Sequence, residues 1–271
     1  MKTAIYSWII YPIGICIAQC IGVFNAKVRE SLRLRTWKDF LSLRLNRDLP
    51  IEYWIHVASQ GELEYAVPII KSLQKHQKQV LVTYYSISAK DAVENLPNIF
   101  SNVSLVVPLP HDGLGLMKEF VRLVCGQGVK FLLLLKYELW PGLLWECNSN
   151  HIKVILVDAL KPSWFHKKLL HKLDAILVGY ASEVVSHKNL KIVGDMRVER
   201  VLERLSYKQA RISQFFSEAI QERLKQKPVF ICGSMWLKDT KLIVKAIKHI
   251  TGQQFQAFPF HLIWIPHELD R

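Results

Sequence analysis

The chain has 271 residues, of which 50% are hydrophobic, and its formal net charge is +13. This length accommodates two modest domains or one large domain with a substantial core. The positive charge favours anionic partners: phosphorylated metabolites, an acidic lipid surface or nucleic acid. We expect no nucleic acid, because no zinc-finger spacing, RNP-like motif or helix-turn-helix pattern accompanies the charge. The five cysteines form no C-x-x-C pair, which argues against disulfides and structural zinc and favours a reducing cytosol.

An uncharged apolar run extends from Ala4 to Phe24 near the start of the chain. Its length, about 21 residues, is close to that needed to cross a bilayer. We therefore expect residues 1–25 to form a membrane anchor, either spanning or interfacial, followed by a basic amphipathic segment at 26–49. The alternative is a hydrophobic helix, broken near Pro12, that packs on the domain. The excess of basic residues after the run places the bulk of the protein on the cytoplasmic side; these residues are Lys27, Arg29, Arg33, Arg35, Lys38, Arg44 and Arg47.

Short apolar runs alternate with helical stretches through the rest of the chain. Stretches such as 62–76 and 114–125 predict helices on both faces of a sheet. A longer charged segment at 206–226 is interpreted as a helical linker between two Rossmann-like units. We predict an α/β fold with a first domain at 50–205 and an incomplete second domain at 206–271. The apolar runs predict buried parallel strands at 53–58, 79–84, 102–107, 129–135, 153–158, 174–179, 191–194, 228–233 and 261–266.

The residues that follow each strand form the candidate site, because open α/β sheets bind ligands at the carboxyl ends of their strands. Glu62 follows the first strand, in the segment Ser59-Gln60-Gly61-Glu62 at the start of a helix. Backbone N–H groups and the helix dipole should keep its carboxylate ionised there. A positioned carboxylate at a strand end is a candidate general base for a sugar hydroxyl. The alternative is an ordinary acidic residue that stabilises the start of a helix.

Two further strand ends carry charged residues. Lys136 and Glu138 follow the aliphatic strand at 129–135, where buried charges are costly unless they pair with each other or bind a ligand. Both interpretations, a structural Lys–Glu pair and a binding site, remain open. Arg197 follows the strand at 191–194 behind a glycine, which indicates phosphate or carboxylate binding or, alternatively, an ordinary surface arginine.

The last two strands are followed by Gly233-Ser234 and by His267-Glu268. A Gly-Ser pair at a strand-to-helix junction can bind a phosphate, although the dipeptide alone is a weak signal. The sequence contains no G-x-G-x-x-G, Walker or G-x-S-x-G motif. We expect no metal site, because the histidines form no H-x-x-x-H pair and the aspartates do not cluster.

Seven segments along the chain resemble, in order, successive motifs of the 3-deoxy-D-manno-octulosonic acid (Kdo) transferases. The form with KYE, GD-x-R and PHE is similar to the Bacteroidetes-like branch. The resemblance covers nearly the whole chain, including the hydrophobic N-terminus followed by basic residues. The segments are WIHVASQGELE, LVTYYSISAKDA, LLLLKYELWP, ILVDALKPSWF, IVGDMRVERV, FICGSMWLKD and IWIPHE.

The resemblance implies a GT-B glycosyltransferase, with two Rossmann-like domains that face each other across a cleft. The family's donor is CMP-Kdo and its acceptor is the lipid A precursor (lipid IVA), in lipopolysaccharide core biosynthesis. The expected location is the anionic surface of the inner (cytoplasmic) membrane, with the catalytic part facing the cytoplasm. The resemblance also implies inverting transfer that uses no metal and no cofactor.

The resemblance assigns roles to particular residues. Glu62 matches the general base of the family's S-x-G-E motif, and Glu138 matches a glutamate credited with transition-state stabilisation. Arg197 stands where many members have lysine in the same stabilising role, and a guanidinium can supply that charge with a different geometry. The expected partial CMP-Kdo site consists of Ser234, His267 and Glu268.

The chain departs from the family pattern at three places. Ala89 replaces a usual glycine, and Pro110 stands at an aspartate-like position. The sequence also ends before the family's glycine-rich G-G-H-N-like segment, so we expect a C-terminally truncated chain. Acceptor and membrane binding without turnover stays open for it, as do three explanations: a partial sequence, a decayed gene or half of a split enzyme. The alternatives are a non-catalytic, membrane-anchored module that binds anionic lipid and another GT-B enzyme that uses nucleotide sugars.

Overall fold

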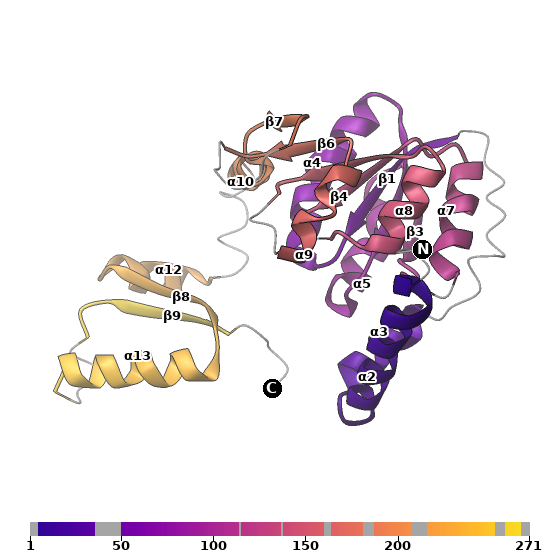
Figure 1. Cartoon of the computed structure of the whole chain (residues 1–271). Helices are drawn as coiled ribbons and strands as arrows, with labels where there is room; N and C mark the ends of the chain where they lie inside the picture. The colour runs from indigo at the N-terminus through magenta and orange to yellow at the C-terminus, as the bar shows by residue number, and fades with distance from the viewer. Residues whose placement is uncertain are drawn as a thin grey trace. The chain divides into compact units, whose positions relative to one another are not determined.

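The computed structural model describes residues 5–35, 50–113, 115–136, 138–159, 164–180, 187–206, 216–252 and 258–266 (Figure 1). The chain forms two compact units, Met1–Leu202 and Glu203–Arg271. His267, Glu268 and Tyr137, which belong to segments singled out in the sequence, lie outside the described residues.

The first unit is built on a seven-stranded parallel sheet with the order β3-β2-β1-β4-β5-β6-β7 (Figure 1). The order reverses between β1 and β4, as it does in Rossmann-type sheets. The predicted strands are confirmed, with their ends correct to within two residues. The strands are β1 (Ile51–Val57), β2 (Gln79–Tyr84), β3 (Val103–Pro108), β4 (Phe131–Leu135), β5 (Lys153–Val157), β6 (Ala175–Val178) and β7 (Leu190–Ile192).

Helices cover both faces of this sheet, which explains why its strands are apolar almost throughout. Alternate side chains of β1 enter two separate hydrophobic clusters: Trp54 packs edge-on against Phe120 of α7, while Ile55 belongs to the cluster that contains Ile70 of α4. One face carries α4 (Gln60–Lys75), α5 (Ile87–Glu94) and α6 (Leu96–Ile99), and the other carries α7 (Leu116–Gly126) and α8 (Pro141–Ser149). The chain continues through α9 (Trp164–Lys167), η3 (Leu170–Lys172) and α10 (Met196–Ser206).

Asp112 stabilises the start of α8 from a distant part of the chain. Its buried carboxylate accepts hydrogen bonds from the backbone N–H groups of Gly142 (2.8 Å) and Leu143 (2.6 Å). Negative charge is favourable at this end of a helix. The contact requires glycine at 142, because a Cβ atom there would lie 2.2 Å from the backbone oxygen of Asp112.

The N-terminus forms a helical hairpin. A π-helical turn, η1 (Tyr6–Ile10), runs into α2 (Tyr11–Phe24), and after extended Asn25 the chain returns as α3 (Ala26–Arg35). At the predicted break near Pro12 the helix changes from π to α without leaving the right-handed helical region, and the chain reverses later, at Asn25. Among the helices in the described part of the chain, none combines the length and apolar character needed to cross a membrane.

Two tyrosines attach this hairpin to the Rossmann-type sheet domain. The Tyr6 hydroxyl donates to Asp112 Oδ2 at 2.9 Å, and the Tyr11 hydroxyl lies 2.9 Å from His111 Nδ1. The hairpin is therefore held by hydrogen bonds to the same loop that caps α8. The outer side chains of η1 and α2 remain largely exposed and apolar: Ile5, Ile9, Ile10, Ile13, Ile17, Ile21, Val23 and Phe24.

The second unit contains a parallel pair of strands, β8 (Val229–Met235) and β9 (His261–Pro266), with helices α12 (Glu218–Lys225) and α13 (Leu237–Ile250). These are the two strands predicted for this part of the chain. The helix predicted over 206–226 is described as helical only at Ser206 and in α12, since residues 207–215 lie outside the described set. The helix α10, which begins at Met196, is not among the predicted elements.

Candidate functional site

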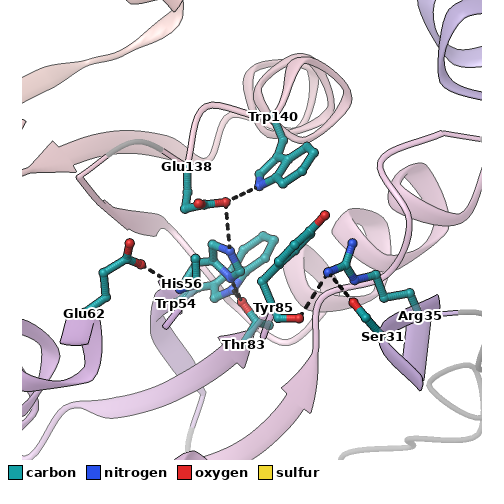
Figure 2. Close-up of polar contacts among 10 residues, drawn as sticks. Ser31, Arg35, Trp54, His56, Glu62, Thr83, Tyr85, Glu138 and Trp140 are labelled. Carbon is teal, nitrogen blue, oxygen red and sulfur yellow. Dashed lines mark hydrogen bonds and ion pairs between the residues drawn. The ribbon is translucent and has the colours of Figure 1, made fainter. Parts of the chain in front are cut away.

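Two carboxylates flank the point where the strand order reverses. Glu62 follows β1 and Glu138 follows β4, and these two strands pair directly in the sheet. In doubly wound folds, ligands bind beyond the carboxyl ends of the strands at this reversal. The structure therefore brings two of the three predicted catalytic residues to the expected edge of the sheet, where Figure 2 shows them beside a buried polar network.

Glu62 is held at the start of α4. The Ser59 hydroxyl accepts from the backbone N–H of Glu62 at 3.3 Å and caps the helix, and Glu62 Oε2 accepts from the Ala58 N–H at 2.6 Å. Only 6% of Glu62 is exposed. Burial, with a smaller contribution from the charge of Glu138, raises its pKa to about 7 against the opposing effects of the Ala58 N–H and Lys136.

The expectation that Glu62 stays ionised is therefore corrected. One hydrogen bond and the helix terminus do not compensate for the water lost on burial, so this carboxyl titrates near neutrality. A pKa near the working pH suits a general base, because the group can accept a proton and later release it.

Glu138 accepts a short hydrogen bond from a residue two positions further along the chain. Its Oε2 accepts from the indole N–H of Trp140 at 2.6 Å, and the same oxygen lies 3.9 Å from His56 Nε2 (Figure 2). Burial raises the pKa of Glu138, while the Trp140 N–H and the positive charge of Arg35 oppose that shift.

The interpretation of Lys136 and Glu138 as a structural ion pair is wrong for the residues described. The Lys136 ammonium lies 4.4 Å from the centre of the Tyr65 ring, and it interacts electrostatically with Glu62 rather than Glu138. Lys136 also adopts a positive φ of 59° directly after β4, which turns the chain away from the strand.

Arg197 reaches the same ring. Its guanidinium lies 5.2 Å from the centre of the Tyr65 ring and forms an ion pair with Asp195 at 2.8 Å. Asp195 also accepts from the Arg197 backbone N–H at 2.9 Å, near the start of α10. Arg197 and Lys136 thus place two cations around Tyr65, and the Arg197 charge is partly neutralised by Asp195. The Arg197 side chain is 55% exposed, so a ligand can reach it.

Sequence reasoning missed a buried arginine beside Glu138. Arg35, at the end of α3, is 5% exposed, and it donates to the Ser31 hydroxyl and the Tyr85 carbonyl at 3.1 Å each (Figure 2). Its guanidinium lies 3.0 Å from the centre of the Tyr85 ring, which in turn stacks on Trp140 at 4.9 Å. In the sequence, Arg35 is one of seven basic residues after the apolar run, and no local signal separates it from the others.

Of the predicted donor-binding residues, the structure describes only Ser234. It lies in β8 with a positive φ of 56° and is exposed. The donor site therefore remains a prediction. Within the described ranges, no group of three or more His, Cys, Asp or Glu side chains could hold a metal ion.

The fold is of the Rossmann type found in GT-B glycosyltransferases, and a comparison with solved structures supports this. The chain is similar to UDP-GlcNAc 2-epimerase from Neisseria meningitidis, crystallised with UDP-GlcNAc, with a TM-score of 0.51 at 12% identity. The match covers 80% of this chain and 72% of that one. At this identity, the likeness concerns the fold alone.

The chain belongs to the Kdo transferase family. The model of that family, described as 3-deoxy-D-manno-octulosonic-acid transferase (kdotransferase), matches residues 27–197, which include Glu62, Glu138 and Arg197.

Curated relatives carry the same name. The 3-deoxy-D-manno-octulosonic acid transferase of Aquifex aeolicus is 27% identical over 73% of this chain and 50% of its own length. That of Rickettsia bellii is 27% identical over 97% of this chain and 61% of its own length. The chain thus spans about half to three fifths of the length of these relatives.

Proposed function

We propose that this protein transfers Kdo from CMP-Kdo to the lipid A precursor lipid IVA, with inversion at the anomeric carbon. The observation that carries this proposal is the placement of Glu62: a buried carboxyl with a pKa of about 7, at the strand-order reversal and in electrostatic contact with Glu138. Family membership supports the sugar that is transferred.

In the proposed reaction, the Glu62 carboxylate takes the proton of an acceptor hydroxyl as that oxygen bonds to the anomeric carbon of Kdo. The bond from this carbon to the CMP phosphate oxygen breaks, and CMP departs with the electron pair. Lys136 and Arg197 supply positive charge on this side of the site, where it stabilises the departing phosphate. No residue in this scheme requires a metal ion.

The other roles are proposed from the family motifs. Glu138 stabilises the transition state, and its orientation by Trp140 is consistent with that role. Ser234, His267 and Glu268 bind the CMP part of the donor.

The test is a transfer assay with CMP-Kdo and lipid IVA, in which the added Kdo is detected as a mass increase of the lipid. We expect Glu62→Gln to reduce turnover by about two to four orders of magnitude while the fold is retained. Glu119→Gln is the matched control, because Glu119 also lies in the first turn of a helix but is exposed on α7. Turnover of Glu62→Gln within a few-fold of the unmodified protein would exclude Glu62 as the base.

We also propose that the N-terminal hairpin lies in the interface of the inner membrane, with the sheet domain facing the cytoplasm. The exposed apolar side chains of η1 and α2 form the surface that enters the lipid, and exposed Arg29 and Arg33 of α3 attract anionic headgroups. This patch belongs to the first unit and continues from the Tyr6 and Tyr11 contacts that fix the hairpin.

Vesicle co-sedimentation tests this placement. Replacing Ile13 and Ile17 by serine should weaken binding to phosphatidylglycerol vesicles at least about tenfold, because each buried isoleucine contributes on the order of 2 kcal/mol. Ile99→Ser, at an exposed position on α6, is the control and should bind as the unmodified protein does. Equal binding by the double variant would mean that the hairpin does not contact lipid.

A second candidate function, a non-catalytic module that binds anionic lipid, is favoured by the exposed apolar side chains of η1 and α2. Vesicle binding that depends on Ile13 and Ile17, together with no Kdo transfer by the unmodified chain, would favour this function over catalysis.

A further inference from the structure

Three buried side chains, Trp54, Thr83 and His56, form a hydrogen-bonded relay whose His56 end faces Glu138. Trp54 and His56 project from β1 to the same face of the sheet, and Thr83 of β2 lies opposite His56. All three are 0% exposed. Thr83 Oγ1 is 2.8 Å from Trp54 Nε1 and 2.9 Å from His56 Nδ1 (Figure 2).

The Thr83 end of this relay determines which nitrogen of His56 carries the proton. The indole N–H of Trp54 can only donate, so it occupies one lone pair of the Thr83 oxygen. The Thr83 hydroxyl hydrogen then has His56 Nδ1 as its acceptor. With the proton on Nδ1 instead, the Thr83 hydroxyl hydrogen would lose this acceptor; only the Thr83 backbone, which also hydrogen-bonds the ring and opposes the fall in the pKa of His56, would favour that tautomer.

The other end of the ring leads to the same tautomer. His56 Nε2 has no hydrogen-bond partner among the described residues, and it lies 3.9 Å from Glu138 Oε2. A protonated Nε2 directs an N–H at the carboxylate, whereas an unprotonated Nε2 would direct a lone pair at it. The ring is neutral in either tautomer, because burial, aided by the charge of Arg35, lowers the pKa of His56 to about 3.

We propose that His56 is a positioning residue for Glu138, held by Trp54 and Thr83 as the neutral tautomer with its proton on Nε2. The Nε2–H and the Trp140 indole N–H point at the same carboxylate oxygen, Oε2, at 3.9 and 2.6 Å. At 3.9 Å the His56 contact with Glu138 is electrostatic rather than a hydrogen bond. Oε1 of Glu138 has no hydrogen-bond partner among the described residues and is left for the ligand.

This inference rests on the proposed function, since Glu138 matters for catalysis only if the site transfers a sugar. It adds a residue to which the family resemblance gave no role. It also gives a role to the fully buried His56 Nε2, which has no hydrogen-bond partner among the described residues, although such an atom is normally destabilising.

Nitrogen-15 NMR of the imidazole rings, in the full chain with labelled histidine, tests the tautomer without any need for activity. The His56 signals are assigned by their loss in His56→Gln. We expect a protonated Nε2 and an unprotonated Nδ1, unchanged between about pH 6 and 8 because the ring remains neutral. A proton on Nδ1, or a ring that titrates in this range, would overturn the proposal.

Thr83→Val and Thr83→Ser separate positioning from simple packing. Valine keeps the shape but removes the hydroxyl, so the His56 proton should redistribute to Nδ1 and the pKa of Glu138, followed by carbon-13 NMR, should rise. Serine keeps the hydroxyl and should match the unmodified protein in both measurements. A Thr83→Val variant with an unchanged tautomer and an unchanged Glu138 titration would contradict the relay.

In the transfer assay, Thr83→Val should lower kcat by about tenfold to a hundredfold with little change in KM, and Thr83→Ser should restore it. If kcat and KM of Thr83→Val both equal those of the unmodified protein, His56 does not position Glu138. A chain that shows the expected tautomer and Glu138 titration but transfers no Kdo supports the positioning and contradicts the proposed function.

Discussion

The raised pKa of Glu62 makes a prediction about stability. Its pKa is about 7 in the folded protein against an ordinary value of 4.5, so between these values the folded state binds more protons than the unfolded chain. The free energy of unfolding should therefore decrease as the pH rises from about 4.5 to 7. The stabilisation that comes from the protonated Glu62 is fully present only below about pH 4.5.

The magnitude follows from the shift. A change from 4.5 to about 7 corresponds to about 3 kcal/mol. Glu62→Gln removes the titrating group and so should flatten the dependence by that amount. Urea unfolding at several pH values, followed by circular dichroism, gives the free energies of unfolding.

The difference between the two proteins reports Glu62 and its coupling to Glu138, because groups outside this pair, such as Asp112, whose pKa burial raises to about 7, contribute equally to both. Glu119→Gln is again the control and should run parallel to the unmodified protein. If Glu62→Gln also runs parallel to the unmodified protein across this range, burial does not raise the pKa of Glu62 and the reasoning fails.

Two further predictions concern the contacts around Asp112. Gly142→Ala should destabilise the first unit by about 2 kcal/mol or more in thermal unfolding, because its Cβ would lie 2.2 Å from the Asp112 backbone oxygen. Gly126→Ala is the control: nothing lies near its Cβ, so this variant should be neutral or slightly stabilising. Tyr6→Phe removes the hydrogen bond to Asp112, so the amide hydrogens of α2 should exchange several-fold faster, while the exchange rates in the sheet stay the same. Equal exchange rates of α2 in both proteins would show that this bond does not hold the hairpin.

The alternation of strands and helices could be predicted from the sequence because it is written in local patterns. Runs of aliphatic residues bounded by polar ones located the strands in the described part of the chain, and the helical stretch predicted over 62–76 agrees with α4 to within two residues. The placement of Glu62 and Glu138 at strand ends followed from the same patterns. The helix α10 was missed because its apolar residues, among them Val198, Val201 and Leu202, are interspersed with charged ones and are exposed.

The candidate site was predictable only in part. Local spacing indicated which strands end in carboxylates, but the pairing of β1 with β4 brings Glu62 and Glu138 together across 76 positions of sequence. Proximity in sequence makes a Lys136–Glu138 ion pair one of the two expected arrangements. After the turn that follows β4, however, Lys136 lies over the Tyr65 ring and Glu138 accepts a hydrogen bond from Trp140.

What the sequence determined by itself is the set of elements and the chemical groups at their ends, since hydrophobic periodicity and helix caps act over a few residues. The tertiary structure decided the strand order, and with it the burial that raises the pKa of Glu62 to about 7 and keeps His56 neutral. It also decided that Arg35, 50 positions before Tyr85, packs on that ring beside Glu138. These features depend on loss of water and on contacts between distant segments, neither of which a local pattern specifies.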